Sequence, residues 1–99
     1  MYTLQLPAQQ SLQVYLDPGH TGFDEFHVTF IGSGGQEIPM ASATVDATPG
    51  GSLTVRRLDQ IGHFVADLPG ATRTRYRFRV DAVTAAGASL GGTFTIPVT

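Results

Sequence analysis

Hydrophobic and polar residues alternate in short runs along most of this chain, and glycine or proline residues separate the runs. Phe26, Val28 and Phe30, for example, alternate with His27 and Thr29. Because successive side chains of a strand point to opposite faces, this period of two predicts strands with one buried and one polar face. We expect the other strands within residues 2–6, 12–16, 41–47, 53–58, 61–68, 73–82 and 93–96.

Turn signals separate the expected strands. They are strongest at Gly32–Gly35, at Pro49–Gly51 and at Ala85–Gly87, and residues 53–68 are typical of a hairpin about Asp59-Gln60. No window of ten residues has a helical period with caps. Seven or eight strands with turns every ~8–12 residues predict an all-β, immunoglobulin-like (fibronectin-type) antiparallel β-sandwich, with an eight-stranded barrel as the alternative. We expect one domain over residues 1–99.

The composition excludes several kinds of site. The chain has no cysteine, which rules out disulfides, a thiol nucleophile, a cysteine zinc site and a blue-copper cysteine. Hydrophobic residues at 41% and charged residues at 14% are typical of a folded domain. The net charge of −2 argues against a general nucleic-acid binder. Because Met1 runs straight into a strand-like segment, we expect a fragment of a longer membrane protein.

Catalytic motifs are weak throughout. The run Gly32-Ser33-Gly34-Gly35 lacks the spacing of a nucleophile elbow, and no helix is predicted after it to bind phosphate. Asp24 and Glu25 are adjacent, so on a strand they would point to opposite faces and form no acid–base pair. We therefore expect the chain not to be an enzyme.

Three histidines and one internal methionine are candidate metal ligands. His20 lies in a glycine-flanked loop, His27 and His63 fall on the polar sides of their strands, and Met40 follows a proline. Imidazole binds Cu(II) and Zn(II) well. No two of these residues have a ligand-like spacing, so any site would combine different strands. Scattered histidines are also typical of an ordinary surface. For a copper site the candidates are His20, His27 and Met40, with His63 as a fourth, and we expect His20 and His27 to be exposed.

An arginine occupies every second position of one strand, at Arg73, Arg75, Arg77 and Arg79. These side chains share one face of the strand. They could form an interaction strip that binds lipid head groups or an acidic partner. The alternative is a solvated face whose arginines pair with carboxylates such as Asp67 on a neighbouring strand.

The order of segments resembles a known family. The segments that carry the resemblance are Tyr2–Pro7, Asp17–Gly19, Gly22 with Phe26–Phe30, Gly35–Pro39, and Gly62–Pro69. In this order they resemble the C-terminal extracytoplasmic domain of bacterial CopD-type copper-resistance membrane proteins, the YtkA-like family. The resemblance covers nearly the whole chain, although each motif is loose. Asp24 stands where the family usually has asparagine, and Phe64 where it more often has tyrosine.

The resemblance implies an immunoglobulin-like sandwich that follows a multi-helix membrane region, on the cell-surface or periplasmic side of a bacterial membrane. It also implies a role in copper homeostasis, with membrane association through the parent chain, but it transfers no metal ligand. Our first hypothesis is an accessory domain of a copper-resistance or copper-transport protein that binds copper or a partner protein. The second is a structural or protein-interaction sandwich with no metal role.

Overall fold

The computed structural model describes residues 1–18, 23–69 and 74–98. Of the candidate site residues, His20 and Arg73 lie outside these ranges, as do Gly19 and Gly22 of the segments that carry the resemblance. Among the described residues, no helix is long and apolar enough to cross a membrane.

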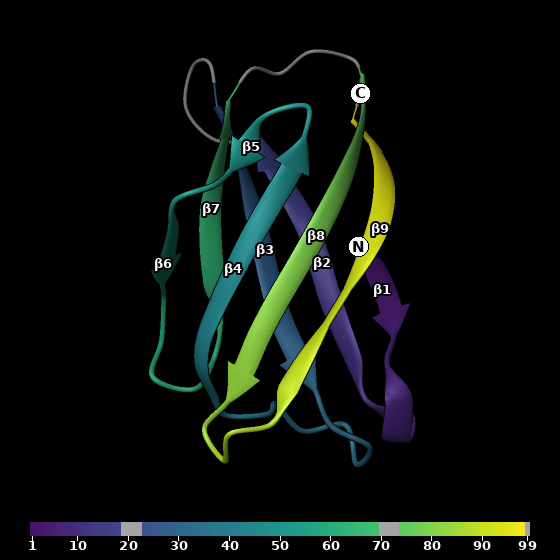
Figure 1. The fold of residues 1–99 in the computed structure, drawn as a ribbon, viewed down its shortest axis with the longest axis vertical. Helices are drawn as coiled ribbons and strands as arrows, with labels where there is room; N and C mark the ends of the chain where they lie inside the picture. The colour runs from purple at the N-terminus through teal and green to yellow at the C-terminus, as the bar shows by residue number, and fades with distance from the viewer. Residues whose placement is uncertain (19–22, 70–73, 99) are drawn as a thin grey trace.

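Two antiparallel sheets pack face to face (Figure 1). The first sheet has five strands, in the spatial order β1 (Tyr2–Gln5), β2 (Ser11–Pro18), β3 (Phe23–Ile31), β7 (Phe64–Pro69) and β6 (Val55–Arg57). The second has four, in the order β5 (Gly51–Ser52), β4 (Met40–Thr48), β8 (Thr74–Thr84) and β9 (Ser89–Val98). A single 3-10 turn, η1 (Pro7–Gln9), follows β1. The predicted antiparallel β-sandwich is confirmed. The described residues form nine strands, two of them very short, where seven or eight were predicted.

The interior contains the apolar half of each alternating pattern. Phe26, Val28 and Phe30 of the first sheet are buried, and so are Phe78 and Val80 of the second. Ring contacts join the two sheets, since the centroids of Phe26 and Phe78 lie 4.6 Å apart. Burying a side chain of this size stabilises the fold by about 2–3 kcal/mol, so these pairs fix which face of each sheet points inward.

The hairpin predicted about Asp59-Gln60 is confirmed, but its strands are shorter than expected. The Asp59 carboxylate accepts hydrogen bonds from the backbone N–H groups of Ile61, Gly62 and His63, at 2.9, 2.8 and 3.1 Å. This turn takes up residues 59–63, so β7 begins only at Phe64.

Candidate functional site

The strand register brings polar side chains together on the outer face of the first sheet. Tyr15 of β2 lies opposite His27 of β3, and the next pair on that face is Asp17 opposite Glu25. On the other side of β3, Glu25 lies opposite Asp67 of β7. We call this group the His27 cluster, and it comprises Tyr15, Asp17, Glu25, His27, Arg56, His63 and Asp67.

His27 is the centre of the cluster and is nearly buried, with 7% of its surface exposed. The Tyr15 ring stacks on its imidazole, with centroids 4.4 Å apart and planes 6° from parallel. Its Nδ1 lies 3.0 Å from Nε2 of His63, and its Nε2 lies 3.3 Å from Oε1 of Glu25. The expectation that His27 is exposed is therefore wrong. Alternation gave its direction correctly, but Tyr15 of β2 and His63, which lies just before β7, cover it.

With Glu25 ionised and both imidazoles neutral, one arrangement of protons satisfies these contacts. With Glu25 as a carboxylate, the Nε2–H of His27 donates to Glu25, and Nδ1 of His27 then accepts from the Nε2–H of His63. Such a relay orients the imidazole through both ring nitrogens. An oriented imidazole with a carboxylate beside it is a common basis for metal ligation.

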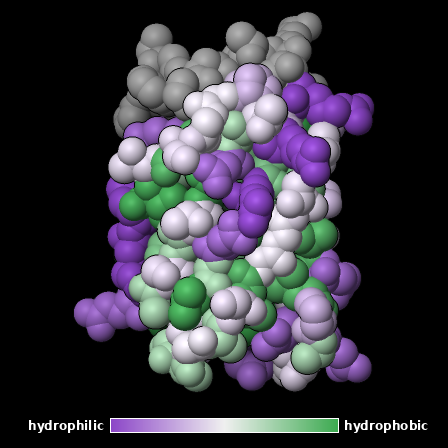
Figure 2. Space-filling model, viewed as in Figure 1, coloured by the Kyte–Doolittle hydropathy of each residue, from purple (hydrophilic) through white to green (hydrophobic). Residues whose placement is uncertain are grey.

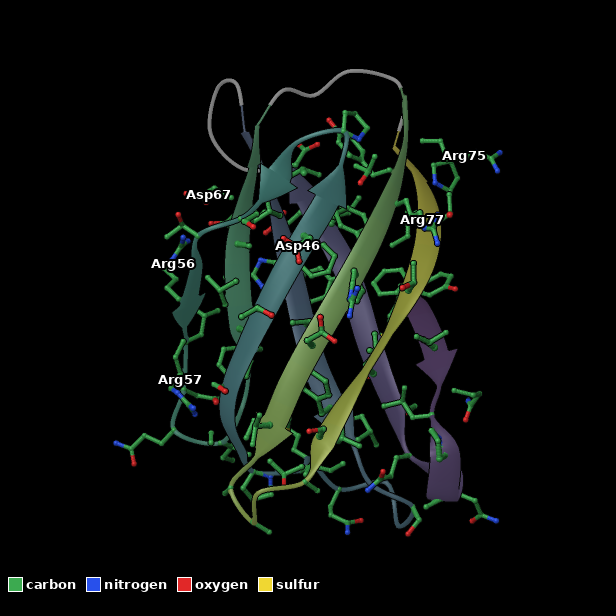
Figure 3. The ribbon with its side chains drawn as sticks, viewed as in Figure 1. Asp46, Arg56, Arg57, Asp67, Arg75 and Arg77 are labelled. Atoms are coloured by element: carbon green, nitrogen blue, oxygen red, sulfur yellow. The ribbon has the colours of Figure 1, made fainter. Side chains whose placement is uncertain are left out.

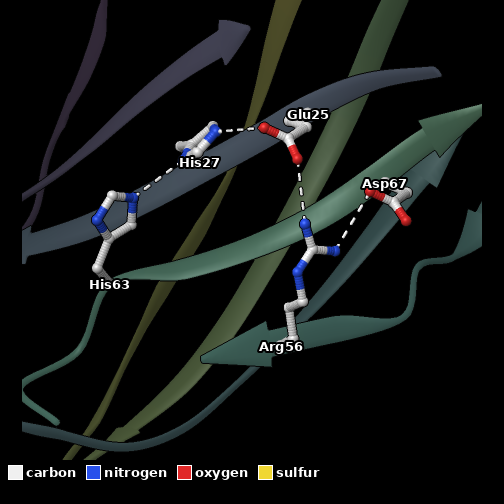
Figure 4. A network of polar contacts seen from close by, with 5 residues as sticks. All are labelled: Glu25, His27, Arg56, His63 and Asp67. Atoms are coloured by element: carbon white, nitrogen blue, oxygen red, sulfur yellow. Dashed lines mark hydrogen bonds and ion pairs between the residues drawn. The ribbon is translucent and has the colours of Figure 1, made fainter. Parts of the chain in front are cut away.

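The three carboxylates of the cluster, Asp17, Glu25 and Asp67, form an acidic row across β2, β3 and β7 that is only partly neutralised. Arg56 of β6 bridges two of its members, with Nη2 3.1 Å from Oε2 of Glu25 and Nη1 3.3 Å from Oδ1 of Asp67 (Figure 4). Within the described ranges, the side chain of Asp17 has no ion-pair partner. One guanidinium thus pairs with two of three carboxylates in adjacent strands, and like charges placed side by side on a sheet repel each other. The face favours an additional cation.

Three members of the cluster can act as metal ligands together. One ligand atom from each of Asp17, Glu25 and His27 lies within 4.8 Å of the other two. Tetrahedral N and O ligands about a zinc-sized ion are about 3.3–3.6 Å apart, given bonds of about 2.0–2.2 Å. The 3.3 Å between His27 Nε2 and Glu25 Oε1 already matches this spacing, although it is long for a hydrogen bond. The third ligand would come from the exposed Asp17.

The structure separates the predicted metal ligands. Met40 is 3% exposed and packs in the core between the sheets, whereas His27 lies on the outer face of the first sheet. His63 contacts His27 through Nε2, but it is not part of the group of candidate ligands that His27 forms with Asp17 and Glu25. His20 lies outside the described residues. Of the three residues proposed first, only His27 belongs to a group of candidate ligands in the described part of the chain.

Asp17, Glu25, Arg56 and Asp67 were not identified from the sequence as parts of a site. A signal for two of them was present: Tyr15-x-Asp17 and Glu25-x-His27 flank the loop between two strands, so a hairpin places their outward side chains opposite one another. No comparable local signal placed Arg56 or Asp67 there.

The Asp59 turn holds the start of β7, and with it His63. The N–H of His63 and then that of Gly62 lower the pKa of the Asp59 carboxyl below its usual 3.8, because both hydrogen bonds favour the charged form. The ionised carboxylate thus supports the turn that positions the imidazole beside His27.

The outer face of the second sheet is different in kind. The exposed side chains of Arg75, Arg77 and Arg79 lie along β8, and hydrophilic atoms gather in the middle of this face (Figure 2). Arg79 Nε donates to Asp81 Oδ2 at 3.0 Å, on the same strand. Among the described residues, Arg75 and Arg77 have no carboxylate within ion-pair distance. A shallow, open depression beside them is lined by Asp46, Thr48, Arg77, Arg79 and Thr93.

One expectation about this arginine strip is corrected. Asp67 was suggested as a partner on a neighbouring strand, but it lies on β7 of the other sheet and pairs with Arg56. Figure 3 shows Arg56 and Asp67 on the side of β6 and β7, away from Arg75 and Arg77. The sequence pattern could not assign these strands to sheets.

Comparison with known proteins supports the fold alone. No family model matches the chain, and no curated protein matches it. A solved structure, that of a DUF4426 family protein from Pseudomonas aeruginosa PAO1, is similar with a TM-score of 0.73. The two chains are 11% identical, and the similarity covers 99% of this chain and 96% of that one.

Proposed function

We propose that this chain is a non-enzymatic, extracytoplasmic accessory domain of a bacterial copper-handling membrane protein, and that it binds metal at the His27 cluster. The observation that carries the proposal is the buried imidazole of His27, whose Nε2 points at Glu25. The carboxylate of Asp17 lies beside them and lacks an ion-pair partner among the described residues. The copper role and the placement outside the cytoplasm rest on the resemblance to the YtkA-like family.

The types of ligand atom narrow the choice of metal ion. Imidazole nitrogen and carboxylate oxygen suit Cu(II) and Zn(II), whereas Cu(I) prefers sulfur ligands. Met40 is held in the core, apart from His27. For the described part of the chain we therefore propose a divalent ion rather than Cu(I).

A non-enzymatic role fits the surroundings of the histidines. Among the described residues, the hydrogen-bond partners of the two imidazole rings are each other and Glu25, and no hydroxyl nucleophile is bonded to either ring. A triad-like arrangement needs a nucleophile within hydrogen-bond reach of its base.

Titration of the ¹⁵N-labelled chain with Zn(II), Cu(II) and Ag(I), followed by NMR, tests the proposal. We expect Zn(II) to shift, and Cu(II) to broaden, the resonances of Asp17, Glu25 and His27 at equimolar metal. Ag(I), a mimic of Cu(I), should leave them unchanged. His20→Ala in the same titration tests the loop histidine separately. Spectra that stay constant up to millimolar Zn(II) and Cu(II) would contradict a metal role.

A second candidate function uses the opposite face. Arg75 and Arg77 are exposed and lack carboxylate partners within the described ranges, which favours an acidic protein partner at the arginine strip. Reversing both charges, in Arg75→Glu/Arg77→Glu, should weaken capture of the parent membrane protein and leave metal titrations unchanged. Equal capture by the variant and the original chain would eliminate this function.

A further inference from the structure

Arg56 occupies the place where the His27 cluster needs a cation. It comes from β6, a three-residue strand at the edge of the sheet, and its side chain is 49% exposed. A guanidinium does not lose its proton in proteins, so Arg56 is a permanent positive charge beside Glu25. Among the described residues it is the arginine that forms ion pairs with this acidic row.

Glu25 faces two cation sites at once. Its Oε1 lies toward His27 Nε2, where a metal would enter, and its Oε2 lies toward Arg56 Nη2 at 3.1 Å. A divalent ion bound to Oε1 would draw on the same carboxylate and would be repelled by the adjacent guanidinium. Metal and Arg56 therefore compete for Glu25.

We propose that Arg56 is an internal competitor that sets the affinity of the Asp17–Glu25–His27 site for a divalent ion such as Zn(II) or Cu(II). When the ion binds, Arg56 keeps Asp67 and releases Glu25. Its exposed, edge-strand position allows this movement without change in the core. The inference rests on the proposed function, because it names what regulates the same site.

When the ion replaces Arg56 at Glu25, the protons on His27 and His63 also change position. The ion takes the lone pair of His27 Nε2, so the proton of that nitrogen moves to Nδ1. Nδ1–H then donates to His63 Nε2, which gives up its own proton and carries one on Nδ1 instead. Both imidazoles remain neutral and no proton is lost overall. His63 thus acts as a positioning residue and not as a ligand.

The test is calorimetric titration of the 99-residue chain and its Arg56→Gln variant with Zn(II) and, separately, with Cu(II). Gln is shorter than Arg but remains polar, and it removes the charge. Arg77→Gln is the matched control, because it makes the same charge change on the opposite sheet. We expect Arg56→Gln to bind Zn(II) about five- to tenfold more tightly. Arg77→Gln should differ from the original chain by less than about twofold.

Asp17→Asn identifies the site without disturbing the buried residues, since Asp17 is exposed. It should weaken binding in the Arg56→Gln background by about tenfold or more. A long-range ¹H–¹⁵N imidazole spectrum should show the His63 proton move from Nε2 to Nδ1 when Zn(II) is added.

The outcomes separate the two proposals. Tighter binding by Arg56→Gln alone supports the competition. Binding by the original chain that Arg56→Gln leaves equal or weaker overturns the competition while the metal function stands. Equal tightening by Arg56→Gln and Arg77→Gln also overturns it, because the effect is then one of net charge. Absence of binding by every chain contradicts the proposed function itself.

Discussion

The two outer faces of this sandwich carry similar numbers of charged residues but arrange them differently. On the first sheet, Tyr15, Glu25 and His63 from separate segments of the chain converge on the imidazole of His27, which is only 7% exposed. On the second sheet, the arginines lie along a single strand, and the ion pair Arg79–Asp81 joins neighbours on that strand. Convergence of segments encloses a polar side chain, whereas repetition along one strand gives an exposed charged surface.

The largest expected difference concerns the removal of one side chain from each face. His27→Ala leaves a gap beneath Tyr15 and removes the partner of His63, so we expect the free energy of unfolding to fall by about 1–3 kcal/mol. Arg77→Ala removes an exposed side chain and should change it by less than about 0.5 kcal/mol. Urea denaturation of both variants measures the two effects. Equal losses would mean that the His27 cluster is no better packed than the arginine strip.

A smaller difference is expected between the ion pairs. Double-mutant cycles on Glu25–Arg56 and on Arg79–Asp81 should give coupling energies of about 0.5–1 kcal/mol and about 0–0.3 kcal/mol, respectively. The first pair is better shielded from water, with side chains 25% and 49% exposed, compared with 55% and 67% in the second. Both expected coupling energies allow for screening by solvent. A stronger coupling in the second pair would show that crossing between strands gives no advantage.

The smallest expected effect concerns pH and the Asp59 turn. Because folding lowers the pKa of Asp59, its ionised carboxylate stabilises the native state at pH values above the usual 3.8. That contribution is lost as the pH falls through 3.8 toward the lower pKa of the folded state. Asp59→Asn should therefore reduce the melting temperature at pH 7 more than at pH 3. A constant difference between the two chains from pH 7 to pH 3 would show that the charge of Asp59 is not involved.

The sequence predicted what depends on local pattern and could not predict what depends on strand pairing. The alternation about His27 placed Phe26 and Val28 inward and His27 outward, as the structure has them. The burial of His27 was missed, because its cover comes from Tyr15 and from His63, which is 36 residues away in the chain. Asp67 was associated with the wrong arginines for the same reason. A period of two shows which way a side chain points but not which strand lies beside it.

The edge strand β6 contributes two adjacent arginines with unrelated tasks. Arg56 points outward to Glu25, while Arg57 donates to the carbonyl oxygens of Met40 and Ala41 at 2.7 and 2.9 Å and lies 5.0 Å from the centre of the Phe64 ring. Arg57 thereby joins the edge of the first sheet to β4 of the second sheet.

Because neighbouring strand residues face opposite ways, a slip of β6 by one position would exchange these tasks. It would carry the Arg57 guanidinium away from β4 and leave the carbonyl groups of Met40 and Ala41 without their donor. Inserting or deleting one residue in the short connection at 53–54 would shift β6 in this way. The chain could then keep either the bonds from Arg57 to β4 or the ion pair of Arg56 with Glu25, but not both. Alignments of related chains should therefore show a fixed length for this segment even where its residues vary.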